Sequence, residues 1–220
     1  MVPNTEALIL PLKEPEYLLY QGTFDRIRKY YFRKVLATTG FPPGSSLLDY
    51  GCGPGDMLEV AAQVGWSAVG VDSSQRSVDI ARKRGLEVTL ADSSSLPFAK
   101  GSFDLIFLQS VVEHVPNPMQ LLTELREYLR PDGLIVISSP TPGSHFWDDP
   151  THIRPHTPTS FKTLAEIAGL RPISINYVFA FLLGIKTTSS LWYKVMNVVP
   201  FALGSNILGM FRRGSSSEYP

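Results

Sequence analysis

Four histidines lie in the second half of the chain, and imidazole is the side chain best suited to accept a proton near neutral pH. His114 follows an apolar run in the pair Glu113-His114, whereas His145, His152 and His156 lie in a proline-rich stretch at residues 140–158. A base at such a position would serve a reaction that removes a proton from a hydroxyl group. We therefore treat His114 and His152 as candidate catalytic residues and interpret His145 as a packing or capping residue.

His152 and His156 are four positions apart, and on a helix this spacing would place both rings on one face, with Asp149 close by. Such a set could bind a divalent metal ion. Three prolines within residues 150–158 argue against a helix here, because proline removes a backbone donor and clashes with the preceding turn. We therefore expect no metal site.

Arg154 is a fixed cation in the same segment. It could bind a carboxylate or phosphate of a substrate, or form an ion pair within the chain with Asp148 or Asp149. The internal ion pair is the interpretation that we favour, and Arg154 and His156 are the candidate substrate-binding residues of this segment.

A glycine-rich turn follows an apolar run at residues 47–50 and contains Gly51, Gly53 and Gly55. Glycines allow a ligand to approach the backbone closely. Dinucleotide-binding folds have similar turns, but the Gly-x-Gly-x-Gly spacing lacks the third glycine of their fingerprint. Asp72 ends the next apolar run, where a carboxylate can accept hydrogen bonds from both ribose hydroxyls. The two features together indicate a ligand that contains a nucleoside.

Short apolar runs alternate with amphipathic segments along most of the chain, and this alternation is typical of a parallel α/β sheet. Thr157-Pro158 has the form of a helix start, and Gly169 lies where that helix would end. We therefore predict an α/β fold with a doubly wound, mostly parallel seven-stranded sheet and a helical insertion before the last strand. The expected strands are residues 46–50, 68–72, 87–91, 103–109, 134–138, 172–179 and 206–211, and the expected helices are residues 24–37, 56–65, 75–84, 118–129 and 158–168.

The chain divides into an N-terminal extension with a basic amphipathic helix (residues 1–44), one domain (residues 45–214) and a flexible tail (residues 215–220). An apolar and basic insertion at residues 181–203 contains Lys186, Lys194 and Trp192, and no acidic residue occurs between Ile167 and Ser217. The insertion could cover the substrate, with Trp192 in contact with it. It could instead rest on an anionic membrane surface, form a homodimer contact or add a core layer.

Composition excludes several classes of protein. Twenty basic and twenty acidic residues give no net charge, so we expect no nucleic-acid partner. Cys52 is the only cysteine, which fits a reducing compartment. We see no secretory signal, and the longest uncharged apolar run is far too short to span a bilayer, so we expect a cytoplasmic protein that could be peripheral at the membrane.

Three later segments complete a recognisable pattern: Ala91-Asp92-Ser93 after the third expected strand, residues 102–107 as the fourth, and Leu129-Arg130-Pro131-Asp132-Gly133-Leu134 before the fifth. Together with the glycine turn and Asp72, they resemble the class I S-adenosylmethionine-dependent methyltransferases over residues 45–169. Related methyltransferases also have a similar Glu-His after the fourth strand and a similar Asp-Pro-Thr-His-x-Arg-Pro segment after the fifth.

The resemblance implies S-adenosyl-L-methionine as the cofactor and S-adenosyl-L-homocysteine as the product, and it implies a role for nine residues. The glycine turn would surround the methionine part, with Asp49 and Gln109 near its ammonium group. The ribose would lie at the end of the second strand and the adenine after the third. The implied cofactor-binding residues are Asp49, Gly51, Gly53, Gly55, Asp72, Ser73, Asp92, Ser93 and Gln109.

The predicted function is methyl transfer from S-adenosylmethionine to a hydroxyl group of a small molecule, which could be linked to a lipid or a sugar. Direct displacement requires the acceptor, methyl carbon and sulfur to be held in line, and a hydroxyl acceptor must also lose a proton. The alternatives are a nicotinamide-dependent oxidoreductase and a non-catalytic domain that binds S-adenosylmethionine.

Overall fold

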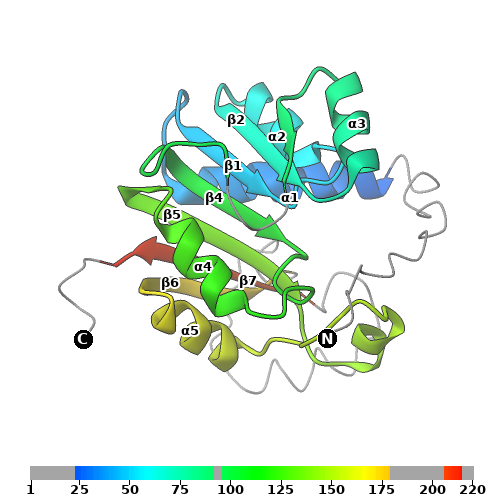
Figure 1. Ribbon diagram of the computed structural model, residues 1–220, viewed down its shortest axis with the longest axis vertical. Helices are drawn as coiled ribbons and strands as arrows, with labels where there is room; N and C mark the ends of the chain where they lie inside the picture. The colour runs from blue at the N-terminus through cyan, green and yellow to red at the C-terminus, as the bar shows by residue number, and fades with distance from the viewer. Residues whose placement is uncertain (1–22, 92–95, 179–205, 215–220) are drawn as a thin grey trace, which may run out of the picture.

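One seven-stranded sheet forms the centre of the molecule (Figure 1), and the computed structural model describes residues 23–91, 96–178 and 206–214. The strand order is β3-β2-β1-β4-β5-β7-β6, and all neighbouring strands are parallel except β7, which runs antiparallel to β5 and β6. The mostly parallel seven-stranded sheet predicted from the sequence is therefore confirmed. The strands are β1 (Ser46–Tyr50), β2 (Ser67–Asp72), β3 (Val88–Leu90), β4 (Phe103–Gln109), β5 (Leu129–Pro140), β6 (Leu170–Tyr177) and β7 (Asn206–Arg213).

Helices cover both faces of this sheet, so the fold has three layers (Figure 1). Helices α4 and α5 contribute to the apolar cluster on one face, and α1 and α2 contribute to the cluster on the other. Helix α3 packs beside α2 through a third, smaller cluster. The helices are α1 (Thr23–Thr39), α2 (Asp56–Gln63), α3 (Gln75–Lys83), α4 (Pro118–Arg126) and α5 (Pro158–Ile167), with a short 3-10 helix η2 (Ser144–Asp148).

Strand β4 shows why the sheet is apolar on both sides. Ile106 and Leu108 belong to the cluster under α4 and α5, whereas Leu105 and Phe107 belong to the cluster under α1 and α2. Alternate side chains of a strand point to opposite faces, so a strand covered by helices on both faces is apolar throughout. This is why the sequence shows uninterrupted apolar runs rather than an alternating pattern.

Local signals in the sequence set the ends of the helices. Thr157 caps α5 in a capping box with Ser160, and Gly169 has φ of 72° after the helix, as the sequence predicts. Strand β5 is longer than predicted, because Leu129 already pairs with Phe103 and the Arg130-Pro131-Asp132-Gly133 stretch lies within the strand at a register shift.

The order of the strands determines where a ligand can bind. Strands β1 and β4 are neighbours, yet β2 and β3 extend the sheet on one side and β5 extends it on the other. Loops that leave the carboxyl ends of β1 and β4 therefore diverge, and open α/β sheets bind ligands at such a point. The glycine turn and the Glu113-His114 pair both follow these strand ends.

Three expectations concern segments outside the described residues: the insertion at residues 181–203 with Trp192, the tail at residues 215–220, and Asp92 with Ser93. They remain predictions, as does the division of the chain into regions. In the described ranges, no helix is both long enough and apolar enough to cross a bilayer.

Candidate active site

The glycine turn joins β1 to α2 and takes its shape from left-handed backbone conformations. Gly51, Gly53 and Gly55 have φ of 77°, 53° and 89°. A Cβ on Gly51 would lie 2.5 Å from Val111, which places the turn directly beside the loop after β4. A Cβ on Gly53 would meet nothing within 4 Å, so the backbone at this point faces open space. The turn is therefore a cradle against which a ligand can lie.

Asp72, at the end of β2, connects the cradle to the neighbouring loop. Its two carboxylate oxygens accept hydrogen bonds from the backbone N–H groups of Gly53 at 2.7 Å and Ser74 at 2.8 Å. A carboxylate oxygen can accept more than one hydrogen bond, so Asp72 can also bind the two ribose hydroxyls. Ser73 is exposed beside it.

Asp49 is a buried carboxyl group on β1, with 3% of the residue exposed. Burial, with further contributions from Asp72 and Asp56, raises its pKa to about 8. No hydrogen bond to its side chain occurs among the residues that the structure describes. Gln109, at the end of β4, likewise has a buried carbonyl oxygen without a hydrogen-bond partner in the described part of the chain. These two acceptors fit an ammonium group, which supplies both positive charge and donors.

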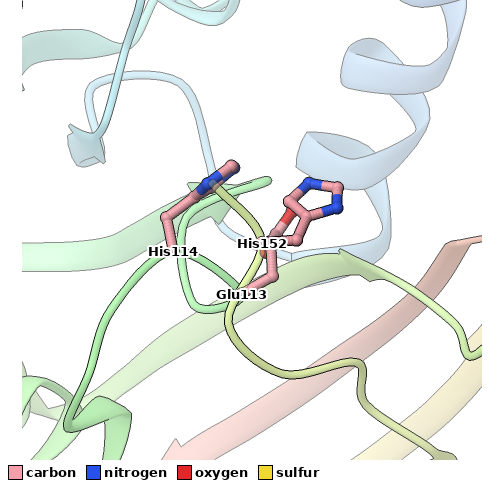
Figure 2. Close-up of side chains that lie close together, drawn as sticks. All are labelled: Glu113, His114 and His152. Carbon is pink, nitrogen blue, oxygen red and sulfur yellow. The ribbon is translucent and has the colours of Figure 1, made fainter. Parts of the chain in front are cut away.

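Glu113, His114 and His152 lie together although 38 residues separate the most distant two (Figure 2). The first two follow β4 through Ser110, a non-glycine residue with φ of 51°. His152 belongs to the segment after η2, and the backbone N–H of Ile153 donates to the carbonyl oxygen of Glu113 at 2.8 Å. One potential ligand atom from each of the three side chains lies within 4.8 Å of the other two.

Glu113 is fully buried. One carboxyl oxygen accepts a hydrogen bond from Ser139 Oγ at 3.0 Å, and the other has no partner within the described ranges. Burial raises the pKa of Glu113 to about 7, opposed by its hydrogen bonds and by His152. A carboxyl group with one buried oxygen uncommitted is a candidate ligand for an acceptor hydroxyl or a cation.

The hydrogen-bond partners of the two rings fix where their protons lie. His152 Nδ1 lies 2.7 Å from the carbonyl oxygen of Phe146, and His114 Nδ1 lies 3.3 Å from that of Thr151. A carbonyl oxygen can only accept, so Nδ1 carries the hydrogen in both rings and Nε2 carries the lone pair of the neutral form.

The two histidine rings differ in their contacts and in their burial. The His152 ring stacks on Phe146 with centroids 4.4 Å apart, and its Nε2 lies 3.8 Å from Asp149. His114 is half-buried, and no hydrogen bond to its Nε2 occurs in the described ranges. Burial and the nearby His152 ring lower the pKa of His114 and so favour its neutral form. No hydrogen bond to the Nε2 of His152 is present in the described ranges either, and the lowered pKa of His114 marks this ring as one that stays neutral and can accept a proton at Nε2.

Two further predicted residues lie outside this cluster. His156 is 2% exposed and packs on Phe161, and burial lowers its pKa to about 4, so it is a neutral ring beneath the surface. Arg154 is exposed, and among the described residues it forms no ion pair with Asp148 or Asp149. The internal ion pair that we favoured from the sequence is therefore wrong.

Glu113, Thr151 and Asp149 were not predicted as site residues. Glu113 stands next to His114 in the sequence, and a lone acidic residue in an apolar run is the signal that could have identified it. Asp149 and Thr151 belong to the Asp-Pro-Thr-His-x-Arg-Pro segment that resembles related methyltransferases, which is the signal that could have identified them, although their contacts with the loop after β4 are visible only in the structure.

The sequence from residue 24 to residue 175 matches the family model described as a methyltransferase domain. This match spans more than half of the chain. The chain belongs to the class I S-adenosylmethionine-dependent methyltransferases. The cofactor of this family is S-adenosylmethionine, so we reject the alternative of a nicotinamide-dependent oxidoreductase.

The chain is similar to one curated protein that is named as a methyltransferase, to one that is uncharacterized, and in fold to a solved methyltransferase. A ubiquinone biosynthesis O-methyltransferase from Cereibacter sphaeroides is 38% identical over 142 residues, which cover 62% of this chain and 57% of that protein. An uncharacterized 37.1 kDa protein from a transposon of Streptomyces fradiae is 39% identical over 146 residues, or 63% of this chain and 41% of that protein. The chain thus spans about half the length of these curated relatives. A crystal structure of a SAM-dependent methyltransferase from Archaeoglobus fulgidus has the same fold, with a TM-score of 0.67 at 24% identity over 89% of this chain and 99% of that one.

The described residues of this methyltransferase fit its cofactor. The open backbone at Gly53 leaves room for the methionine part, and the carboxyl of Asp49 and the carbonyl of Gln109 can receive its ammonium group. Asp72 retains acceptor capacity for the ribose hydroxyls. A divalent cation is a second ligand that the Glu113, His114 and His152 set could hold.

Proposed function

We propose that this methyltransferase transfers a methyl group to a hydroxyl group of a small molecule with an apolar or aromatic body. The observation that carries the proposal is the position of His114. Its uncommitted Nε2 lies in the loop after β4, and Val111 of the same loop contacts the glycine cradle. A hydroxyl acceptor needs such a base, whereas an acceptor that has no proton to lose does not.

S-adenosylmethionine, when bound, supplies a methyl group on a positively charged sulfur atom. The cradle and Asp72 would hold the cofactor, and the cluster after β4 would hold the acceptor. His114 Nε2 would accept the proton of the acceptor hydroxyl, and the bound cofactor would supply the methyl group to the acceptor oxygen. The remaining contribution of the protein is to align these atoms, which can account for a large part of the rate.

Exposed apolar side chains beside the cluster support an apolar acceptor. Trp147 in η2 is 64% exposed and Ile153 is 51% exposed, although large apolar side chains are usually buried. The relative from Cereibacter sphaeroides is named as a ubiquinone biosynthesis O-methyltransferase, and an apolar phenol would suit this rim. A lipid-linked phenol is accordingly the first acceptor to test, and a sugar-linked hydroxyl is the second.

The test measures transfer of a labelled methyl group from S-adenosylmethionine to phenols with and without prenyl tails and to sugar-linked hydroxyls. His114→Asn is the informative variant, because the amide nitrogen of asparagine can replace Nδ1 while nothing replaces Nε2. We expect it to bind S-adenosylmethionine normally and to transfer methyl groups about 10²- to 10⁴-fold more slowly. Gln120→Ala, on the exposed face of α4, is the control.

Two results would contradict the proposal. Wild-type rates in His114→Asn would show that this ring is not the base. Tight binding of S-adenosylmethionine by the wild type without transfer to any hydroxyl acceptor would favour the non-catalytic alternative.

A further inference from the structure

Thr151 connects His114 to Asp149 through an unbroken chain of hydrogen bonds. His114 Nδ1 lies 2.9 Å from Thr151 Oγ1, and Thr151 Oγ1 lies 2.6 Å from Asp149 Oδ1. The same carboxylate oxygen accepts the backbone N–H of Thr151 at 2.8 Å, so a tight turn fixes the threonine against the aspartate. The three residues come from two loops that are brought together by the fold.

The direction of each hydrogen bond follows from the groups involved. Burial opposes ionisation of Asp149, but its hydrogen bonds with Thr151 lower its pKa below the ordinary value, so it is a carboxylate and can only accept. Thr151 has a single hydroxyl hydrogen and donates it to Asp149. The lone pairs of Thr151 Oγ1 therefore face His114, whose Nδ1–H donates to them. The backbone carbonyl of Thr151, 3.3 Å from the same nitrogen, favours the same arrangement.

We propose that Asp149 and Thr151 are positioning residues for methyl transfer: they hold His114 with its hydrogen on Nδ1 and its lone pair on Nε2. This inference rests on the proposed function, in which Nε2 takes the proton of the acceptor hydroxyl. The ring then becomes a cation whose Nδ1–H still donates to Thr151, and the negative charge of Asp149 offsets the new positive charge. Asp149 Oδ2 also lies 3.8 Å from His152 Nε2, so the same carboxylate faces both rings.

Asp149 and Thr151 are well placed for this role because neither is needed to hold the core. Both are exposed, and both lie in a segment without regular secondary structure that follows η2. Ile153, in the same segment, anchors it to the loop of His114 through the backbone bond to Glu113. Substitution of either residue should therefore change which ring nitrogen of His114 carries the hydrogen, without unfolding the protein.

The first measurement is the tautomer of His114 in the full-length protein, obtained from long-range ¹H–¹⁵N correlation spectra of ¹⁵N-histidine-labelled samples. We expect the Nδ1–H form in the wild type, and a smaller preference for it in Thr151→Val. Thr151→Ser keeps the hydroxyl and should restore the wild-type spectrum. Thr123→Val, which removes an exposed hydroxyl bonded to Met119 O, is the matched control.

The second measurement separates kcat from KM for methyl transfer. Thr151→Val and Asp149→Asn should each lower kcat about tenfold, the effect expected from one hydrogen bond to a charged group, while KM for cofactor and acceptor stays within about twofold. Thr151→Ser should recover the lost kcat. Asp79→Asn, at an exposed carboxylate bonded to Gln75, is the control for the aspartate change.

The outcomes distinguish failure of this inference from failure of the proposed function. An Nε2–H tautomer in the wild type, or wild-type kcat in both Thr151→Val and Asp149→Asn, would overturn the positioning role. Wild-type activity in His114→Asn would instead overturn the base itself. If no acceptor is methylated, the tautomer measurement still decides whether the chain of hydrogen bonds determines which nitrogen of His114 carries the hydrogen.

Discussion

Binding of S-adenosylmethionine should release a proton from Asp49, and the size of the effect follows from the position of this residue. With a pKa of about 8, Asp49 is about nine-tenths protonated at pH 7. An ammonium group beside it favours the carboxylate, so cofactor binding should expel nearly one proton at this pH. The affinity should then increase by almost tenfold per pH unit between pH 6 and 7, and the increase should become smaller as the pH approaches 8.

Calorimetry can measure this release directly. Titrations of the same protein at pH 7 in two buffers with different ionisation enthalpies give different heats, and the difference is the number of protons released. Asp49→Asn has no titrating group at this position, so its heat should not depend on the buffer. Its affinity should be nearly constant from pH 6 to 7.5, a range in which the amino group of the ligand stays largely charged. Equal heats in both buffers for the wild type would refute the reasoning.

Stability provides an independent check on Asp49. The ordinary pKa of the group is 3.8, and the folded protein raises it, so the folded state retains a proton that the unfolded chain releases. The contribution of this group to stability is therefore lost as the pH rises from about 4 to 8. Asp49→Asn should raise Tm at pH 8 by several degrees, since about 1 kcal/mol corresponds to roughly 2–4 °C at this length. The gain should shrink at pH 5, and Asp79→Asn should show neither effect.

Four other predictions concern the two sides of the site. Asp72→Ala should weaken cofactor binding by about 100-fold in calorimetry, because it removes the ribose acceptor and frees the N–H of Gly53; unchanged affinity would exclude Asp72 from the site. Gly51→Ala should lower Tm more than Gly40→Ala, since both glycines have φ near 76° but only Gly51 would place its Cβ 2.5 Å from a neighbour; equal losses would show that Val111 moves aside. Treatment with a chelator should leave the transfer rate unchanged if His114 is the base, whereas activity that is lost and then restored by a divalent ion would assign a metal to Glu113, His114 and His152. Trp147→Ala should raise KM for apolar acceptors several-fold while the cofactor Kd stays constant, and an unchanged KM would remove Trp147 from the acceptor rim.

The sheet and its helices could be predicted from the sequence because local patterns determine them. Every described strand and α-helix overlaps an apolar or amphipathic segment, whereas the short helix η2 was not predicted. Asn117 and Thr157 begin α4 and α5 as N-caps, and Gly169 follows the end of α5 with a left-handed backbone conformation. The cofactor side is equally local, since Gly51, Gly53 and Gly55 lie within five residues of each other and directly after a strand. Asp72 could be predicted for the same reason.

The acceptor side could be predicted only in part. His114 and His152 can be identified by residue type and by their positions after the fourth and fifth expected strands, whose ends share one sheet edge with the glycine turn. The sequence does not show that the two rings lie against each other, because no repeat, spacing or cap connects residue 114 to residue 152. The predicted ion pair of Arg154 is wrong for a related reason: Asp149, one of its two expected partners, accepts hydrogen bonds from the backbone N–H and the hydroxyl of Thr151. The raised pKa of Asp49 also depends on how deeply β1 is buried.

This contrast reflects how the two halves of the site are built. The cofactor side consists of strand ends and main-chain turns, which the packing of the sheet holds in place, so substitutions there change stability and cofactor affinity together. The acceptor side consists of side chains on the loops after β4 and β5, where Trp147, Thr151 and Asp149 are exposed. Those loops can change without disturbing the sheet. Acceptor specificity should therefore depend on residues 146–154 and be separable from cofactor binding, and the Trp147 and Thr151 variants test that separation.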